Sequence, residues 1–375
     1  MRPQRKDSIT TDAVAAAAPA PFIHVGFTTA TLTRDCVLVL LPSLVWGFYC
    51  FGIRAALVVL ASISSALIGE LILDWVARRF SLFDGSAFLT GLLLGLAMPP
   101  GVPFYVPCIS ALFAVIVVKG CFGGIGSNWM NPALGGLVFS LISWPRAMST
   151  WLLPRHLAGV AGISGATPLG FVRDHAAAGS SGTVLEILTG SGINFSETDK
   201  NITLFLNETF FAPIGAELPF GYLDLLLGNR SGSIGELSGL LLLIGSVILI
   251  ARRSIRWEIP LSILISFGLL TRIFGGLPFG EGLFSGDLLF SLFSGSFLLV
   301  SFFMATDPVT SPRTKTGRYV YGTGVGILTF LLRTFGSQPE GTAFALLMMN
   351  CFTPWIDRHS SWKNRPRQMS EGVVE

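Results

Sequence analysis

The sequence predicts an all-α polytopic membrane protein of about ten transmembrane helices, arranged as an inverted 5+5 repeat with a small extracytoplasmic loop domain. Of its 375 residues, 51% are hydrophobic and only 13% are charged, and the mean hydropathy is +0.66. Soluble domains carry about 25% charged residues, so water cannot cover this whole surface. Apolar stretches recur along nearly the whole chain, and many approach the ~20 residues of a membrane span. These observations exclude one large soluble core.

Ten apolar segments predict the spans, with five on each side of a more polar stretch. They lie at residues 36–52, 54–77, 84–98, 102–118, 132–144, 234–251, 258–275, 284–304, 319–333 and 341–356. Each half then holds an odd number of spans, so the two halves must have opposite orientations. This is the inverted-repeat plan of many transporters, whose sites lie near the midplane on interrupted helices.

A weak internal repeat supports this plan. Residues 85–100 resemble residues 295–308 in their apolar run between a Gly-Ser pair and a proline, and the Phe-Gly pair at 122–123 resembles the pair at 335–336. Several predicted spans are shorter than the ~20 residues of a full crossing. We therefore expect interrupted segments of the two halves to meet near the midplane.

Charged residues predict the orientation. If the N-terminus is inside, 17 of the 25 Lys and Arg residues lie inside and 8 outside, and loops rich in Lys and Arg stay in the cytoplasm. Both termini are therefore expected in the cytoplasm. The predicted parts are a disordered cytoplasmic leader (1–33), a first five-helix membrane half (34–144), an extracytoplasmic loop region (145–233), a second five-helix membrane half (234–357) and a cytoplasmic tail (358–375).

The composition argues against several classes of site. The net charge is +3 and no basic patch alternates with aromatic residues, so nucleic acid is not expected as a partner. The five cysteines show no CxxC spacing and the four histidines are scattered, so no metal site is predicted. No residue of this chain is predicted to be catalytic.

Two motifs combine glycines with groups that bind ligands. In SGATPL (164–169), a turn of small residues presents a threonine hydroxyl suited to accept a bulky group; an ordinary glycine-containing turn is the alternative. In FGGIGSNWMNPA (122–133), Asn131 before Pro132 predicts a helix start, and the glycines let the backbone approach a ligand closely. A tight interhelical loop is the alternative for this second motif.

Two further motifs place acidic residues at membrane edges. FMATDPVTSP (303–312) carries Thr306 and Asp307 where proline must break the helix, and GNRSGSIGELS (228–238) opens the sixth span with a carboxylate. An acid costs about 2.5–3.5 kcal/mol at mid-bilayer and less near the edge, so some acids near the lipid are expected to be interfacial. The candidates for an ion pathway are Glu70, Asp84 and Glu236.

Together these motifs resemble the D subunit of the Rnf ion-translocating electron-transport complex. The sequence is more distantly similar to the B subunit of the sodium-pumping NADH:quinone oxidoreductase. The resemblance runs from about residue 84 to residue 357, and it is carried by DGSA, FGGIGSNWMNPA, SGATPL, GNRSGSIGE, FMATDPVTSP and GRYVYG.

The resemblance implies two flavins. In that family the threonine of SGAT is esterified to the phosphate of FMN, which implies covalent FMN on Thr167, in a motif completed by Ser164, Gly165 and Ala166. The family also has a second, non-covalent flavin, such as riboflavin, within the membrane domain. Irregular backbone at membrane depth requires polar partners, so we expect the second flavin where helices of both halves break; helix capping alone is the alternative. The residues expected there are Asn128, Asn131, Thr306 and Asp307.

The function implied by the resemblance is electron relay in a multi-subunit pump of the bacterial cytoplasmic (inner) membrane that moves Na⁺ or H⁺. The chain would be a translocase subunit and not a complete enzyme. Partner subunits would carry iron–sulfur clusters, a second covalent flavin and the nucleotide site, and a flavin transferase would attach the FMN. Because fold does not fix function, a small-solute permease of the urea-transporter type without redox activity is the alternative.

Overall fold

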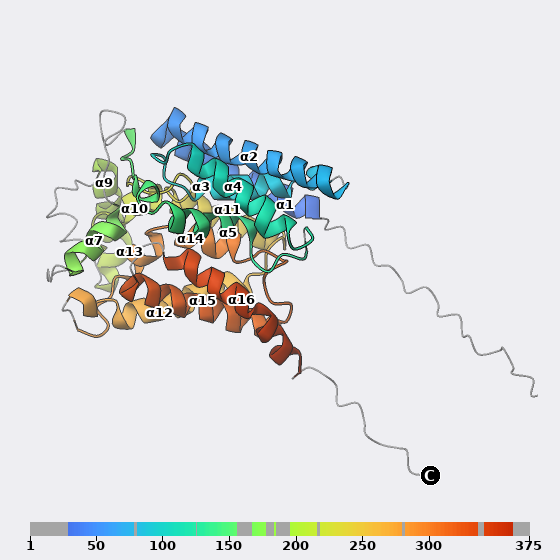
Figure 1. Cartoon of the computed structure of the whole chain (residues 1–375). Coiled ribbons are helices and arrows are strands. Elements are labelled where there is room, and N and C mark those ends of the chain that lie inside the picture. Colours follow the sequence, from blue (N-terminus) through green and yellow to red (C-terminus); the bar gives the residue numbers. More distant parts are fainter. Residues whose placement is uncertain are drawn as a thin grey trace, which may run out of the picture.

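The computed structural model describes residues 29–78, 81–124, 126–155, 167–177, 184, 196–215, 218–279, 282–336 and 341–362. Within these residues, every regular element of three or more residues is a helix (Figure 1). The all-α fold predicted from the sequence is therefore confirmed. The predicted leader and tail fall largely outside the described residues.

The first half consists of five helical segments near the positions that the apolar pattern predicted, two of them long and three shorter. Its elements are α1 (Thr29–Phe51), α2 (Ile53–Ala77), η1 (Leu82–Asp84), α3 (Ser86–Leu96), α4 (Tyr105–Leu112), the π-helical continuation η2 (Phe113–Gly120) and α5 (Pro132–Ser143). Both α1 and α2 are long and apolar enough to cross a membrane, whereas α3, α4–η2 and α5 are shorter apolar helices.

Short helices occupy much of the predicted loop region 145–233. They are η3 (Ala147–Ser149), α7 (Pro168–Ala177), α9 (Glu197–Leu206), η4 (Asn207–Phe211), η5 (Ala212–Ile214) and α10 (Tyr222–Leu227). Val172 of α7, Val184 and Leu225 of α10 are buried in a small apolar cluster that also includes Phe290 of the second half. This region is thus tied to the second half by a small core of its own.

The second half repeats the pattern of long and interrupted helices. Its elements are α11 (Gly239–Ala251), α12 (Glu258–Phe274), η6 (Leu277–Phe279), α13 (Leu288–Phe293), α14 (Phe297–Leu299), η7 (Val300–Met304), α15 (Lys315–Phe335) and α16 (Gly341–Trp362). The predicted segment 284–304 is divided between α13 and α14–η7. The sixth helix begins at Gly239 rather than at residue 234 because residues 228–238 form a buried loop.

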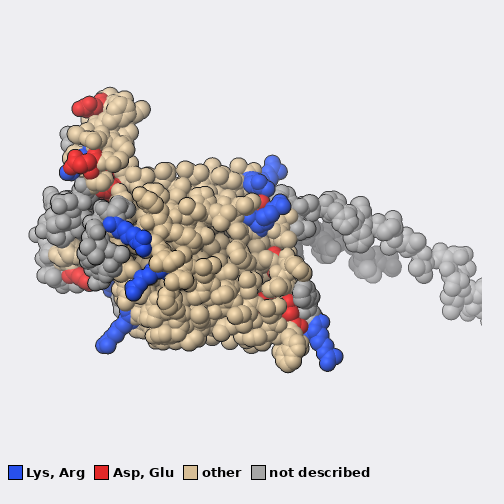
Figure 2. All heavy atoms as spheres, turned by 90° about the horizontal axis from the view of Figure 1, so that it is seen from above, with Lys and Arg blue, Asp and Glu red and all other residues tan. Residues whose placement is uncertain are grey.

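The helices run roughly parallel to one long direction of the molecule. The first described turn of α1 and the last turn of α16 lie at one end, while α7, α9 and α10 lie at the opposite end (Figure 1). Lys and Arg side chains gather toward the two ends of the face seen in Figure 2, and the broad band between them carries few charges. This is the surface expected of a helix bundle that spans a membrane.

Corresponding helices of the two halves pack in corresponding ways. In the first half α2 packs against α4, and in the second half α12 packs against α15. The first helices of the two halves, α1 and α11, contact each other. One apolar core of buried residues runs through both halves, so the halves form one body.

The irregular segments of the two halves meet inside this core. The backbone N–H of Ile234 donates to the carbonyl of Met98 (3.1 Å), and the N–H of Gly235 donates to the carbonyl of Leu96 (2.8 Å). A Cβ atom on Gly235 would lie 2.6 Å from the Cβ of Leu96, so glycine permits this close approach. Backbone outside a helix is tolerated at membrane depth where protein satisfies it, and here the carbonyls of Leu96 and Met98 satisfy two N–H groups of the loop 228–238.

Candidate functional site

A cavity lies between the two halves, at the end of the bundle where α1 begins. The loop after η2, the start of α5 and the break after η7 all contribute to its wall. The four residues predicted from the sequence to surround the second flavin all line this cavity, and they come from both halves. These residues are Asn128, Asn131, Thr306 and Asp307.

Asn131 both begins a helix and joins the two halves. Its Oδ1 accepts hydrogen bonds from the N–H groups of Ala133 (2.9 Å) and Leu134 (3.3 Å), which makes it the N-cap of α5. Its Nδ2 donates to the carbonyl of Met304 at the end of η7 (3.3 Å). The predicted cap is therefore present, and the same side chain holds the FGGIGSNWMNPA motif against the FMATDPVTSP motif.

The break after η7 places two polar side chains on the opposite wall. The Thr306 hydroxyl donates to the carbonyl of Phe302 (2.7 Å). The Asp307 carboxylate accepts from the N–H of Val309 (3.2 Å) and the hydroxyl of Thr310 (3.3 Å), so it closes the turn that Pro308 imposes. On the first wall, Asn128 is 7% exposed and donates to the carbonyl of Met130 (2.9 Å). The cavity thus has polar groups from both halves among apolar residues such as Leu93 and Phe303.

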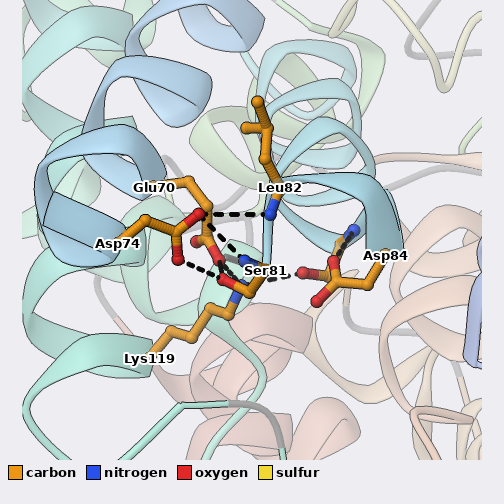
Figure 3. A network of polar contacts seen from close by, with 7 residues as sticks. Glu70, Asp74, Ser81, Leu82, Asp84 and Lys119 are labelled. Atoms are coloured by element: carbon orange, nitrogen blue, oxygen red, sulfur yellow. Dashed lines mark hydrogen bonds and ion pairs between the residues drawn. The ribbon is translucent and has the colours of Figure 1, made fainter. Parts of the chain in front are cut away.

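Lys119 is a cavity residue that the sequence did not single out. Its Nζ donates to Oε1 of Glu70 (2.7 Å; Figure 3) and to Oγ of Ser86 (2.8 Å). Both Lys119 and Ser86 line the cavity. The only signal for it in the sequence is a single basic residue that ends an apolar run just before the FGG motif.

The three predicted ion-pathway acids are divided between two places. Glu70 and Asp84 belong to the polar network beside the cavity, where Asp84 accepts the N–H of Ser86 (2.8 Å) at the start of α3 (Figure 3). Glu236 lies in the buried loop 228–238 and is 2% exposed; its Oε1 accepts the N–H of Ser233 (3.1 Å). Glu236 does not line the cavity.

Thr167 lies at the other end of the bundle. Its Oγ1 accepts the N–H of Gly170 (3.1 Å) and its carbonyl accepts the N–H of Phe171 (2.9 Å), so it begins α7 directly before Pro168. The Thr167 side chain is buried, with 5% of the residue exposed. Three other predicted residues of this motif lie outside the described residues: Ser164, Gly165 and Ala166.

A second cavity adjoins α7 at this end. Leu169 and Arg173 of α7 line it together with residues of α12, α13 and α15. Its floor includes Arg333, whose guanidinium donates to the carbonyls of Ser291 (2.7 Å) and Ser294 (2.9 Å). The lining therefore combines apolar residues such as Phe330 with charged residues, which include Asp287 and the buried Arg333, and the helix that begins at Thr167 forms one wall.

Comparison with known proteins gives one consistent family. The chain matches the model of the NQR2, RnfD, RnfE family over residues 16–365. The D subunit of the proton-translocating ferredoxin:NAD(+) oxidoreductase complex of Clostridium ljungdahlii is 35% identical over 340 residues, which cover 90% of this chain and 92% of that protein.

Two further relatives agree. The D subunit of an ion-translocating oxidoreductase complex of Stutzerimonas stutzeri is 36% identical over 342 residues, 86% of this chain and 87% of that protein. The D subunit of the Na(+)-translocating ferredoxin:NAD(+) oxidoreductase complex of Acetobacterium woodii is 32% identical over 341 residues, 90% of this chain and 91% of that protein. The resemblance inferred from the motifs is confirmed.

Proposed function

Because the chain belongs to the NQR2, RnfD, RnfE family, we propose that it is a membrane subunit of a redox-driven ion pump and relays electrons through two flavins. The observation that carries this proposal is the match, along 86–90% of the chain, to the D subunits of ion-translocating oxidoreductase complexes. Under this proposal, partner subunits carry the iron–sulfur clusters, a second covalent flavin and the nucleotide site, and a flavin transferase modifies this chain.

The first flavin is FMN in phosphoester linkage to Thr167. The position of Thr167 at the start of α7 supports this assignment, because the free N–H groups and the dipole of a helix N-terminus favour an anionic phosphate. The second cavity, walled by α7, offers apolar contact close to the same residue. We further propose that the SGATPL region faces the outside and that both termini face the cytoplasm.

The second flavin is non-covalent, such as riboflavin, and occupies the cavity between the halves. An isoalloxazine ring is apolar on its faces and needs donors and acceptors along its edges. The lining fits this chemistry, since Asn128, Thr306 and Lys119 are polar whereas Leu93 and Phe303 are apolar. When bound, the flavin supplies one-electron transfer. The protein residues would hold and orient the ring and keep water from it.

The transported ion is a monovalent cation whose path includes Glu70, Asp84 and Glu236. Relatives of nearly equal similarity are named for proton and for Na⁺ translocation, at 35% and 32% identity. Overall similarity therefore favours neither ion. Ion-flux measurements on the assembled complex would determine which cation the path selects.

Fluorescence of the denatured protein tests the covalent flavin. The wild-type band should fluoresce under ultraviolet light after denaturing electrophoresis, and Thr167→Ala should abolish the fluorescence while the protein still inserts. Thr203→Ala is the matched control, because Thr203 is also a buried threonine of the region between the halves. A fluorescent Thr167→Ala band would reject the assignment, and a wild-type band without flavin would favour the permease alternative.

Reporter fusions test the orientation. A reporter active only outside the cytoplasm should be active after Gly179 and silent after Arg367, because 17 of the 25 Lys and Arg residues lie on the side of the termini. The reverse pattern would place Thr167 in the cytoplasm and contradict the proposed location of the covalent flavin.

A further inference from the structure

Lys119 is placed between the cavity and a buried acidic cluster. Its ammonium group binds Oε1 of Glu70 (2.7 Å; Figure 3) and Oγ of Ser86 (2.8 Å). Lys119 and Ser86 both line the cavity. An ammonium group has three N–H donors, and these two bonds account for two of them. The Lys119 ammonium group therefore binds Glu70 and also lies at the wall of the cavity.

Burial makes this cation sensitive to its surroundings. The side chains of Lys119 and Glu70 are only 4% and 2% exposed. Charges interact far more strongly in a low-dielectric interior than at a wet surface, and mobile salt screens buried charges weakly. A negative charge that enters the cavity should therefore weaken the hold of Lys119 on Glu70.

Behind Glu70 the network contains more negative than positive charge. The Ser81 hydroxyl contacts the carboxylates of both Glu70 and Asp74, and Asp74 also accepts the N–H groups of Ser81 (2.9 Å) and Leu82 (3.2 Å) (Figure 3). The Oε2 atom of Glu70 is buried and has no hydrogen-bond partner among the described residues. When Lys119 turns toward the cavity, Glu70 is thus the group left short of a cation.

We propose that Lys119 couples the charge of the cavity ligand to the cation affinity of Glu70. This inference rests on the proposed flavin in the cavity. One electron passes from the covalent flavin of the proposed relay to the cavity ligand, and no covalent bond forms or breaks in the protein. Lys119 then interacts more strongly with the ligand, and Glu70 gains affinity for one monovalent cation, which restores the local charge. Asp307, the other charged residue among those lining the cavity, has its carboxylate bound within its own turn.

The test is the midpoint potential of the cavity flavin, measured by redox titration in full-length Thr167→Ala protein, which lacks the covalent flavin. Glu70→Gln frees the whole charge of Lys119 for the cavity and should raise the midpoint potential. Adding Lys119→Met removes that charge, so the protein should bind the reduced flavin at least tenfold more weakly relative to the oxidised flavin. This change corresponds to a fall of about 59 mV in the midpoint potential for one electron. The Lys119→Met, Glu70→Gln double variant leaves no buried unpaired charge, which would be severely destabilising. In the Lys119→Arg, Glu70→Gln variant the arginine guanidinium stays charged, so this variant should keep the higher midpoint potential.

A second buried ion pair supplies the control. Arg318 lies 3.2 Å from Oε1 of Glu258, with side chains 11% and 6% exposed, and neither residue lines the cavity. Neutralising this pair should leave the midpoint potential unchanged. Equal potentials for Glu70→Gln and for the double variant would overturn the role of Lys119. Absence of extractable flavin from Thr167→Ala protein would instead remove the second flavin site itself, and the coupling with it.

Discussion

Replacement of Thr167 by asparagine separates its two roles, as a helix cap and as the proposed flavin acceptor. The hydroxyl of Thr167 accepts the N–H of Gly170 at the start of α7. Asparagine caps helices at least as well as threonine, but its amide cannot form a phosphoester. Thr167→Ala should therefore lose both the cap and the flavin, whereas Thr167→Asn should lose the flavin only.

The magnitude follows from the single capping hydrogen bond. Loss of an N-cap side chain costs about 1 kcal/mol, which corresponds to roughly a fivefold change in an equilibrium constant. In protein made without the flavin transferase, exchange of the Gly170 amide hydrogen should be about fivefold faster in Thr167→Ala than in wild type. Thr167→Asn should exchange at the wild-type rate.

Hydrogen exchange with mass spectrometry over α7 measures this effect, and in-gel fluorescence of protein made with the transferase measures attachment. Equally fast exchange at Gly170 in both variants would refute the capping argument. A fluorescent Thr167→Asn band would refute attachment at this residue while leaving the cap intact.

Two further predictions concern the contacts between the halves. Gly235→Ala brings a Cβ atom to 2.6 Å from the Cβ of Leu96, so it should lower the free energy of unfolding by about 1–3 kcal/mol; thermal unfolding in detergent measures this, and Gly282→Ala, where nothing lies within 4 Å, should have no such effect. In Thr167→Ala protein, adding Asn128→Leu and Asn131→Leu should remove the flavin released by acid extraction while the subunit stays folded. Unchanged extractable flavin in this last protein would contradict the placement of the second site.

The helices themselves were predictable because their signals are local. The apolar runs predicted the long helices, although the run at 284–304 is divided between α13 and α14–η7 and the run at 234–251 becomes a helix only at Gly239. The Asn131-Pro132 pair predicted the start of α5, since this signal depends on residues close in the chain. The helix break at Asp307-Pro308 was predictable for the same reason. Four residues chosen from such breaks converge on one cavity, where Asn131 of the first half contacts the carbonyl of Met304 in the second.

The features that sequence reasoning missed depend on distant partners. Lys119 carries no motif in the sequence, and only the structure places Glu70, 49 residues earlier, beside it. Residues 228–238 were expected to open a span, but they form a buried loop because their N–H groups find acceptors at Leu96 and Met98. Such pairings leave no periodic trace in the chain.

The crossed loops at the centre of the bundle also limit how this protein moves. Ile234 and Gly235 are hydrogen-bonded to the backbone of the other half inside the apolar core, where an unsatisfied backbone group costs several kcal/mol. Rocking of one half against the other would break both bonds without water to replace them. The two halves are therefore expected to move together at this point, because relative movement would leave these backbone groups unsatisfied.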